Sequence, residues 1–130
     1  MASSDYDGRQ VPVILFPRYT TILGTGGDEF TTLPLDMTEF ESARITLWRS
    51  TMQGTSSPTV TFFFDESTDR NTWTNCEDTP FGGETISSDN SELVVPFPVG
   101  RKWFRLRARL DGGAPAVTIW AQGFLIRRQR

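Results

Sequence analysis

The chain has 130 residues, of which 12% are aromatic, and a formal net charge of −3. This length is sufficient to bury a core without disulfides, and the aromatic content excludes a disordered composition. The negative charge argues against non-specific binding to nucleic acid or to an anionic membrane.

The sequence has no histidine and one cysteine, Cys76. This excludes an intramolecular disulfide, Ser-His-Asp and Cys-His catalytic sites, and zinc sites built from His or several Cys. The N-terminal residues are polar and acidic rather than a signal peptide, and no stretch approaches the roughly 20 apolar residues of a membrane span. We therefore expect a soluble protein that is made in a cytosol.

The first strand signal is the apolar run Gln10–Phe16. It contains Pro12, which cannot donate to a ladder, so it predicts an edge strand that Tyr19–Leu23 could continue. The glycine loop Gly24–Gly27 lacks the Lys-Ser/Thr of a phosphate-binding loop, and a plain turn is the better interpretation.

Alternation of apolar and polar residues predicts further strands through the middle of the chain. They cover Phe30–Leu35, Arg44–Met52, Thr59–Ser67, a return strand from Thr72, and Ser91–Phe97. Asp36–Glu41 suits one helical turn or an irregular crossover, and Gln53–Pro58 is predicted as a loop. The polar stretch Asn75–Asn90 is longer than a usual connection, and such loops tend to be functional or mobile.

The last third of the chain organises the predicted fold. Phe104, Leu106, Ala108 and Leu110 alternate with three arginines, which is typical of a half-buried strand. Asp111–Gly113 tolerates positive φ, so a hairpin is predicted there, with Pro115 in its loop or first in the returning strand. The returning segment, residues 117–126, is apolar on both faces, which indicates a central strand or a face that meets a partner.

No window has a sustained helical period. Many short strands separated by turn signals predict an all-β protein, an antiparallel β-sandwich that is jelly-roll-like and forms a single domain. We expect a flexible N-terminal arm over residues 1–9, the sandwich domain over residues 10–127, and a basic C-terminal tail over residues 128–130.

The carboxylates do not suggest an enzyme. Glycoside hydrolysis requires two carboxylates that flank one bond, but the adjacent pairs Asp28-Glu29 and Asp65-Glu66 point to opposite sides of a strand. We expect no catalytic residues, no cofactor and no metal site. Ca²⁺ near Asp69 is compatible with a sandwich, although no ligand spacing requires it.

Arg105, Arg107 and Arg109 form a stripe on one strand face, with Trp103 at its head. Like charges on one face repel unless something neutralises them. The favoured interpretation is neutralisation by Asp65, Glu66 or Glu92 on neighbouring strands. An acidic partner surface or a second copy of the chain comes next, and nucleic acid last.

The four tryptophans Trp48, Trp73, Trp103 and Trp120 suit a sugar-stacking platform or anchors in the core and at interfaces, and the second interpretation is favoured. Cys76 opens the long polar loop, and a single thiol there is better explained as a small buried apolar group than as a reactive site.

The segment Phe64–Thr74 resembles the E-S-x-D-G-x-x-W hairpin of discoidin-like and related β-sandwiches, with Arg70 in place of the turn glycine. Trp103–Arg107 resembles the strand that follows in those folds. Together with residues 117–128 at the C-terminus, these motifs most resemble small virion proteins of tailed phages. That resemblance implies head decoration or another virion role.

The sequence thus predicts a non-enzymatic structural protein of a virion, a bacteriophage capsid decoration or stabilising protein that binds a symmetric protein lattice. Expected partners are other virion proteins, of capsid or tail, and copies of itself, without direct contact with nucleic acid or membrane. Its expected location is the virion, after synthesis in the host cytoplasm. The candidate interface residues are Trp103, Arg105, Arg107, Arg109, Trp120, Phe124, Arg127 and Arg128. The alternative is a carbohydrate-binding module that binds a glycan through Trp73 or Trp103 and the loop Asn75–Asn90.

Overall fold

A computed structural model of the chain describes residues 9–129, which form strands and turns and no helix. The strands are β1 (Gln10–Leu23), β2 (Glu29–Thr31), β3 (Leu35–Asp36), β4 (Phe40–Arg49), β5 (Gln53–Ser67), β6 (Thr74–Asn75), β7 (Glu84–Thr85), β8 (Ser91–Pro98) and β9 (Trp103–Arg127). All strand pairs are antiparallel. The predicted all-β antiparallel sandwich in a single domain is confirmed.

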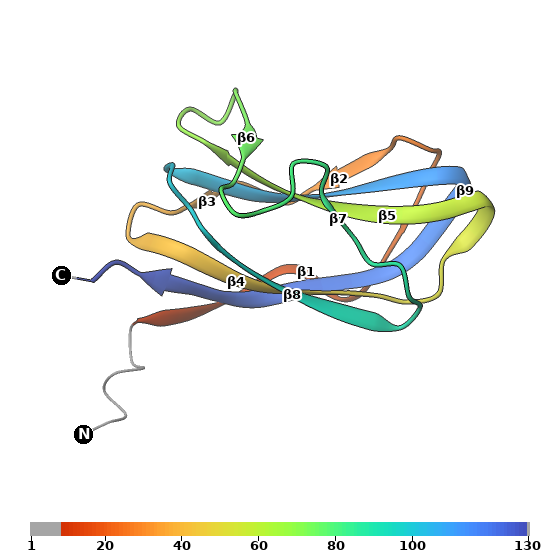
Figure 1. Ribbon diagram of the computed structural model, residues 1–130, viewed down its shortest axis with the longest axis horizontal. Coiled ribbons are helices and arrows are strands. Elements are labelled where there is room, and N and C mark those ends of the chain that lie inside the picture. Colours follow the sequence, from red (N-terminus) through yellow and green to blue (C-terminus); the bar gives the residue numbers. More distant parts are fainter. Residues whose placement is uncertain (1–8, 130) are drawn as a thin grey trace, which may run out of the picture.

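The strands are arranged in two facing layers (Figure 1). In the upper layer of Figure 1, here called the first sheet, the first half of β9 lies between β5 and the short strands β2 and β3, and β6 and β7 extend the outer edge of β5. In the lower layer, the second sheet, the second half of β9 lies between β1 and β4, and β8 pairs with β4. The segment 117–126 is therefore a central strand, as predicted.

The predicted hairpin at Asp111–Gly113 is wrong. Residues 103–110 and 117–126 do not pair with each other, because the 25-residue strand β9 bends and passes from one sheet into the other. Gly112, at φ 109°, and Ala114, at φ 46°, supply the bend. Pro115 is fully buried inside the strand rather than in a loop. Residues that tolerate positive φ serve here to turn a corner between two sheets.

The predicted loop Gln53–Pro58 is also wrong, because these residues belong to β5. Gln53 pairs with Ala116 and Thr55 with Gly113, so β5 follows β9 around the corner. The register shifts between Thr55 and Thr59, and the intervening Ser56 and Ser57 have positive φ, which describes an irregular bulge. A bulge lets one strand bend with its partner while the ladder continues on both sides.

Smaller differences concern strand ends. The predicted strand Phe30–Leu35 is divided into β2 and β3. Of the predicted crossover Asp36–Glu41, only residues 37–39 connect strands, through a turn, because Asp36 ends β3 and Phe40 begins β4. β1 is a continuous edge strand, as predicted, with a bulge between Phe16 and Thr20. Residues 1–8 of the predicted arm and Arg130 of the predicted tail lie outside the described residues.

The core lies between the two sheets and follows the alternation of the sequence. The inward side chains of the central strands are fully buried; they are Ile45, Leu47, Val60, Phe62, Phe64, Phe104, Leu106, Ala108, Leu110 and Ile119. The Phe97 ring of β8 lies 4.9 Å from the Phe64 ring and 5.4 Å from the Phe104 ring, so it joins the two layers.

Gly123 lies where the backbones of β4 and β9 leave no room for a side chain. It pairs with Ile45, and a Cβ at this position would overlap the carbonyl oxygen of Arg44 and lie 2.9 Å from the Cα of Ile45. Because these are backbone atoms in the middle of a sheet, the neighbours cannot move away at low cost.

We expect Gly123→Ala to lower the free energy of unfolding by about 2 kcal/mol or more, the cost of overpacking at a rigid site. Gly82→Ala is the matched control, because a Cβ at Gly82 meets no atom within 4 Å. Urea unfolding followed by tryptophan fluorescence measures both. Equal stability of the two variants would contradict the register of β4 and β9.

Candidate functional site

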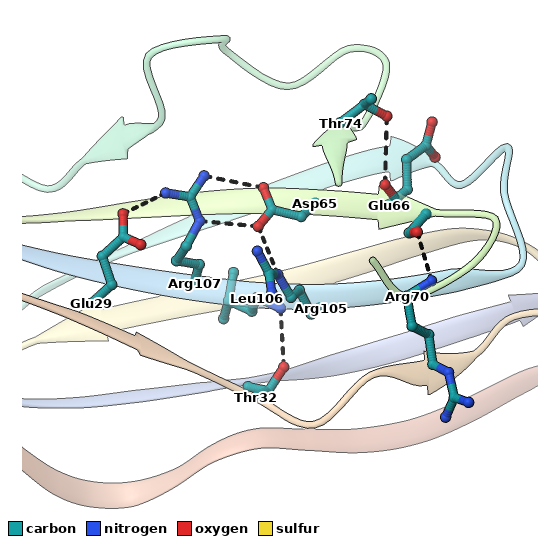
Figure 2. A network of polar contacts seen from close by, with 10 residues as sticks. Glu29, Thr32, Asp65, Glu66, Arg70, Thr74, Arg105, Leu106 and Arg107 are labelled. Atoms are coloured by element: carbon teal, nitrogen blue, oxygen red, sulfur yellow. Dashed lines mark hydrogen bonds and ion pairs between the residues drawn. The ribbon is translucent and has the colours of Figure 1, made fainter. Parts of the chain in front are cut away.

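The arginine stripe lies on the outer face of the first sheet, on the first half of β9 (Figure 2). Asp65 of β5, 4% exposed, accepts hydrogen bonds from Arg105 Nε at 3.0 Å and from Arg107 Nε at 3.0 Å. Arg107 Nη2 reaches the second oxygen of the same carboxylate at 3.3 Å. One carboxylate thus holds two neighbouring arginines of the stripe.

Two further carboxylates, which the sequence analysis did not predict as partners of the stripe, complete the neutralisation of its arginines. Glu29 of β2 accepts from Arg107 Nη1 at 2.6 Å, and Asp111 accepts from Arg109 Nε at 3.0 Å. Burial opposes the charge of Arg107, but its hydrogen bonds to Asp65 and Glu29 outweigh burial and raise the pKa of the guanidinium. These ion pairs match the favoured interpretation, in which the chain neutralises the stripe itself.

The other two predicted partners of the stripe lie elsewhere. Glu66 points away from the stripe, accepts a hydrogen bond from the Gly100 amide at 2.9 Å and lies 3.6 Å from Arg101 Nε. Glu92 is on β8 of the second sheet, opposite Trp48. Alternation along β5 separates Asp65 from Glu66, whereas the position of Glu92 depends on the sandwich topology.

Cations lie over the aromatic rings of the same face. Arg105 lies 4.2 Å from the centre of the Trp73 ring, and Arg107 lies 4.2 Å from the Phe63 ring. Arg70 lies 4.7 Å and Lys102 5.3 Å from the Trp103 ring. Cation–π contacts of this kind occupy ring faces that a sugar would need for stacking.

A groove of about 430 Å³ crosses this face beside the stripe. It is lined by Phe63, Asp65, Trp73, Thr74, Asn75, Phe81, Arg105 and Arg107. Phe81 comes from the long polar loop and is 88% exposed. Trp103 does not line this groove, so the two tryptophans of the predicted sugar site do not share one platform.

The turn after β5, in the segment that resembles the E-S-x-D-G-x-x-W hairpin, is held by hydrogen bonds from backbone amides to its own side chains. Ser67 Oγ accepts from the Arg70 amide at 2.8 Å, and Asp69 Oδ1 accepts from the amides of Asn71 and Thr72. The hydrogen bonds from the Thr72 and Asn71 amides lower the pKa of Asp69. Arg70 has φ 65°, the left-handed conformation for which glycine is favoured.

Cys76 is a free, buried cysteine, as predicted. Burial raises the pKa of its thiol far above the ordinary range, and the nearby charges of Glu66 and Asp65 add to this. Because the thiolate is the reactive form, burial and the raised pKa both disfavour reaction at Cys76 in the folded chain.

The outer face of the second sheet is different in character, because it has several exposed apolar side chains and few charged ones. Strand register places its outward residues in rows across β1, β9, β4 and β8. The rows are Pro12–Phe124–Arg44–Pro96, Ile14–Gln122–Thr46–Val94 and, across the last three strands, Trp120–Trp48–Glu92. Ile14 is 67%, Phe124 44% and Val94 42% exposed.

An aromatic cluster closes one end of this face. The Trp48 and Trp120 rings stack at 6.1 Å and 10°, and Tyr19 meets Trp48 edge-on at 6.2 Å. The bulge in β1 gives Tyr19 φ 65° and brings Arg18 to 4.5 Å from the Trp120 ring. Trp120 is therefore buried although it points outward.

The candidate interface residues occupy three separate places. Trp103 and the arginine stripe lie on the first sheet, and Trp120 and Phe124 lie on the second. Arg127 and Arg128 lie at the C-terminal end of β9. There Arg127 Nη1 donates to Glu39 at 2.8 Å, and Arg128 Nε donates to the Thr38 carbonyl at 3.2 Å. These residues do not form one surface.

The sequence analysis missed the contribution of β1 and β8 to the second outer face. Ile14 and Val94 alternate with more buried residues in their own strands, so the sequence of each strand contained the pattern that marks them as outward residues. Only the pairing of both strands with their neighbours places them on one face with Phe124.

Within residues 9–129, no group of three or more His, Cys, Asp or Glu side chains is placed to hold a metal ion. No helix with the length and apolarity needed to cross a membrane occurs among the described residues.

No protein-family model and no curated protein matches the sequence. The fold is similar to that of VP2 in the crystal structure of the infectious bursal disease virus VP2 subviral particle, with a TM-score of 0.52 and 11% identity over 92% of this chain and 33% of that chain. The structure of the Gx strain of that virus gives a TM-score of 0.49 and 9% identity, over 92% of this chain and 33% of that one.

The CBM22-1 xylan-binding domain of Xyn10C from Paenibacillus barcinonensis gives a TM-score of 0.48 and 14% identity, over 94% of this chain and 85% of that domain. The chain spans about a third of the length of the viral proteins that it matches. At these identities the likeness concerns the fold alone, a jelly-roll-like sandwich as predicted.

Replacing Asp65 tests whether the stripe depends on internal neutralisation. We expect Asp65→Asn to lower the free energy of unfolding by about 3 kcal/mol, because two half-buried arginines lose the carboxylate between them. Asp111→Asn is the control: its pair with Arg109 is about 40% exposed on both sides, and its loss should cost at most about 0.5 kcal/mol. Similar losses for both variants in urea unfolding would contradict this account.

Replacing Arg70 tests the left-handed turn. Arg70→Gly and Arg70→Ala both remove the guanidinium from the Trp103 ring, but only glycine relieves the strain at φ 65°. We expect the glycine variant to be more stable than the alanine variant by about 1 kcal/mol. Thermal unfolding of the pair measures this difference, and an alanine variant of equal or greater stability would exclude the strained turn.

Proposed function

We propose that this chain is a non-enzymatic structural protein of a virion that acts through contacts between sheet faces and neighbouring protein subunits. The observation that carries the proposal is the apolar outer face of the second sheet, on which Ile14, Phe124 and Val94 are exposed. Large apolar side chains that are exposed together on one sheet face favour an interaction site there.

The fold agrees with this role. A sandwich that aligns over 92% of this chain forms part of VP2 in a subviral particle, and jelly-roll sandwiches recur in viral capsid proteins. The resemblance of Phe64–Thr74 and of the C-terminal strand to small tailed-phage virion proteins narrows the proposal to capsid decoration or stabilisation. A protein bound to a lattice gains from multivalency, because neighbouring copies raise its effective concentration.

The arginine stripe has a structural role in this proposal. Asp65 and Glu29 already satisfy Arg105 and Arg107, so these side chains gain little from carboxylates on a partner. The contact with the lattice would instead be mainly apolar, which makes it less sensitive to salt than a contact between charged groups.

One observation favours the alternative, a carbohydrate-binding module. The groove on the first sheet places Trp73 and the exposed Phe81 beside Asp65 and Asn75, a mixture of rings and polar groups that suits a sugar. Arg105 over the Trp73 ring opposes it. Binding of glycans that is lost in Trp73→Ala would favour this function.

The proposal is tested by fractionation of virus particles from cells in which the chain is made. We expect the chain to sediment with intact particles in a fixed ratio to the coat protein and to remain bound in 1 M NaCl, because apolar contacts survive screening of charges. Recovery of the chain only in the soluble fraction, with particles that lack it, would contradict a virion role.

A further inference from the structure

We propose that the outer face of the second sheet is a two-fold contact between copies of this chain, held by its apolar rows and by two reciprocal ion pairs between Arg44 and Glu92. This inference goes beyond the proposed function, because it commits the face to one occupant and does not require a virion.

The edges of the second sheet direct association to its face. β1 and β8 are the two outermost strands of this sheet. β1 contains Pro12 and Pro17, and β8 contains Pro96 and Pro98. Proline cannot donate a hydrogen bond to a neighbouring strand, so addition of a strand at either edge is disfavoured. A partner that buries the exposed apolar area therefore packs on the face of the sheet.

The charges on this face are complementary to themselves. Arg44 of β4 and Glu92 of β8 are both exposed, and neither makes an ion pair within the part of the chain that the structure describes. In the register of β4 and β8, Arg44 lies opposite Pro96, whereas Glu92 lies opposite Trp48. The two charges therefore lie at opposite ends of the face. Strand geometry separates them by about 14 Å.

A two-fold axis in the plane of the face exchanges these ends. If the axis passes between Thr46 and Val94, nearly at right angles to the strands, it places Arg44 of each copy over Glu92 of the other. Both ion pairs form at once, as an isologous contact requires. The remaining charged side chain of this region, Arg18, lies over Trp120 near the β1 edge, away from the axis.

The same operation matches the apolar ends of the face. It lays Phe124 of the end row, and Ile14 of the middle row, over the end that carries the Trp48 and Trp120 rings of the second copy. A shallow recess of about 290 Å³ lies beside Ile14 and Phe124. Side chains of the second copy can pack into this recess.

The size of the face predicts a weak dimer. Four strands about 4.8 Å apart and seven residues of about 3.4 Å each cover roughly 450 Å² per copy, or roughly 900 Å² in total. This is close to the lower limit of about 1,000 Å² for a specific interface. Association should therefore depend on concentration rather than be permanent.

The test is a charge exchange followed by analytical ultracentrifugation between about 1 μM and 1 mM. We expect wild-type chain to form a reversible dimer, and Arg44→Glu and Glu92→Arg each to weaken association about tenfold or more, because both ion pairs become repulsive. An equimolar mixture of the two variants restores both attractions in the heterodimer, and so does the double variant. Association of both should return to the wild-type level.

Glu77→Arg is the control, since Glu77 is exposed in the long loop over the first sheet and its replacement changes the charge as Glu92→Arg does. We expect it to dimerise like wild type. Circular dichroism confirms that each variant is folded.

Two results would overturn the inference. A wild-type chain that stays monomeric throughout would mean that no second copy covers this face, and a dimer that is insensitive to the charge changes would place the contact elsewhere. Neither result decides the virion proposal, because a monomeric chain can still sediment with particles, and a dimer can be absent from them.

Discussion

The hydrogen-bonded ladder between β5 and β9 carries the chain from one sheet to the other, and both outer faces depend on it. Backbone amides and carbonyls along a strand need partners, and β5 supplies them to β9 on both sides of the corner. β5 bends together with β9, and Gln53 and Thr55 continue the pairing beyond the corner. Gly112 permits this close contact, because a Cβ there would lie 2.7 Å from the Cα of Pro58.

This shared bend gives the two halves of β9 different surroundings. In the first half, the outward arginines meet Asp65, Glu29 and Asp111, so the outer face of the first sheet is satisfied by its own ion pairs. In the second half, the outward side chains are Phe124, Gln122 and Trp120, and only the Trp120 ring is covered by a side chain of the same chain. The different chemical character of the two outer faces follows from this asymmetry within a single strand.

Local patterns determined much of the fold. Alternation identified the buried side of β4, β5 and β9, since a period of two depends only on the strand itself. The corner could not be predicted in the same way, because Asp111-Gly112-Gly113 is compatible with both a hairpin and a bend, and only the pairing of β5 distinguishes them. Asp65 was identified as a partner of the stripe, whereas Glu29 lies 78 residues from Arg107 and gave no local signal.

The candidate site was predicted less completely for the same reason. Trp120 and Phe124 were selected from the apolar character of one strand. Their neighbours Ile14 and Val94 come from distant strands that join the face only through sheet order.

Cross-linking at the proposed axis tests the central claim most directly. Thr46 faces outward at the centre of the second sheet, and Thr31, opposite Arg107, faces outward on the first. Buried Cys76 leaves the introduced thiol as the reactive one. With a short bis-maleimide, Thr46→Cys should give a covalent dimer and Thr31→Cys should remain monomeric. Cross-linking of Thr31→Cys without cross-linking of Thr46→Cys would contradict the assignment of the second sheet as the contact face.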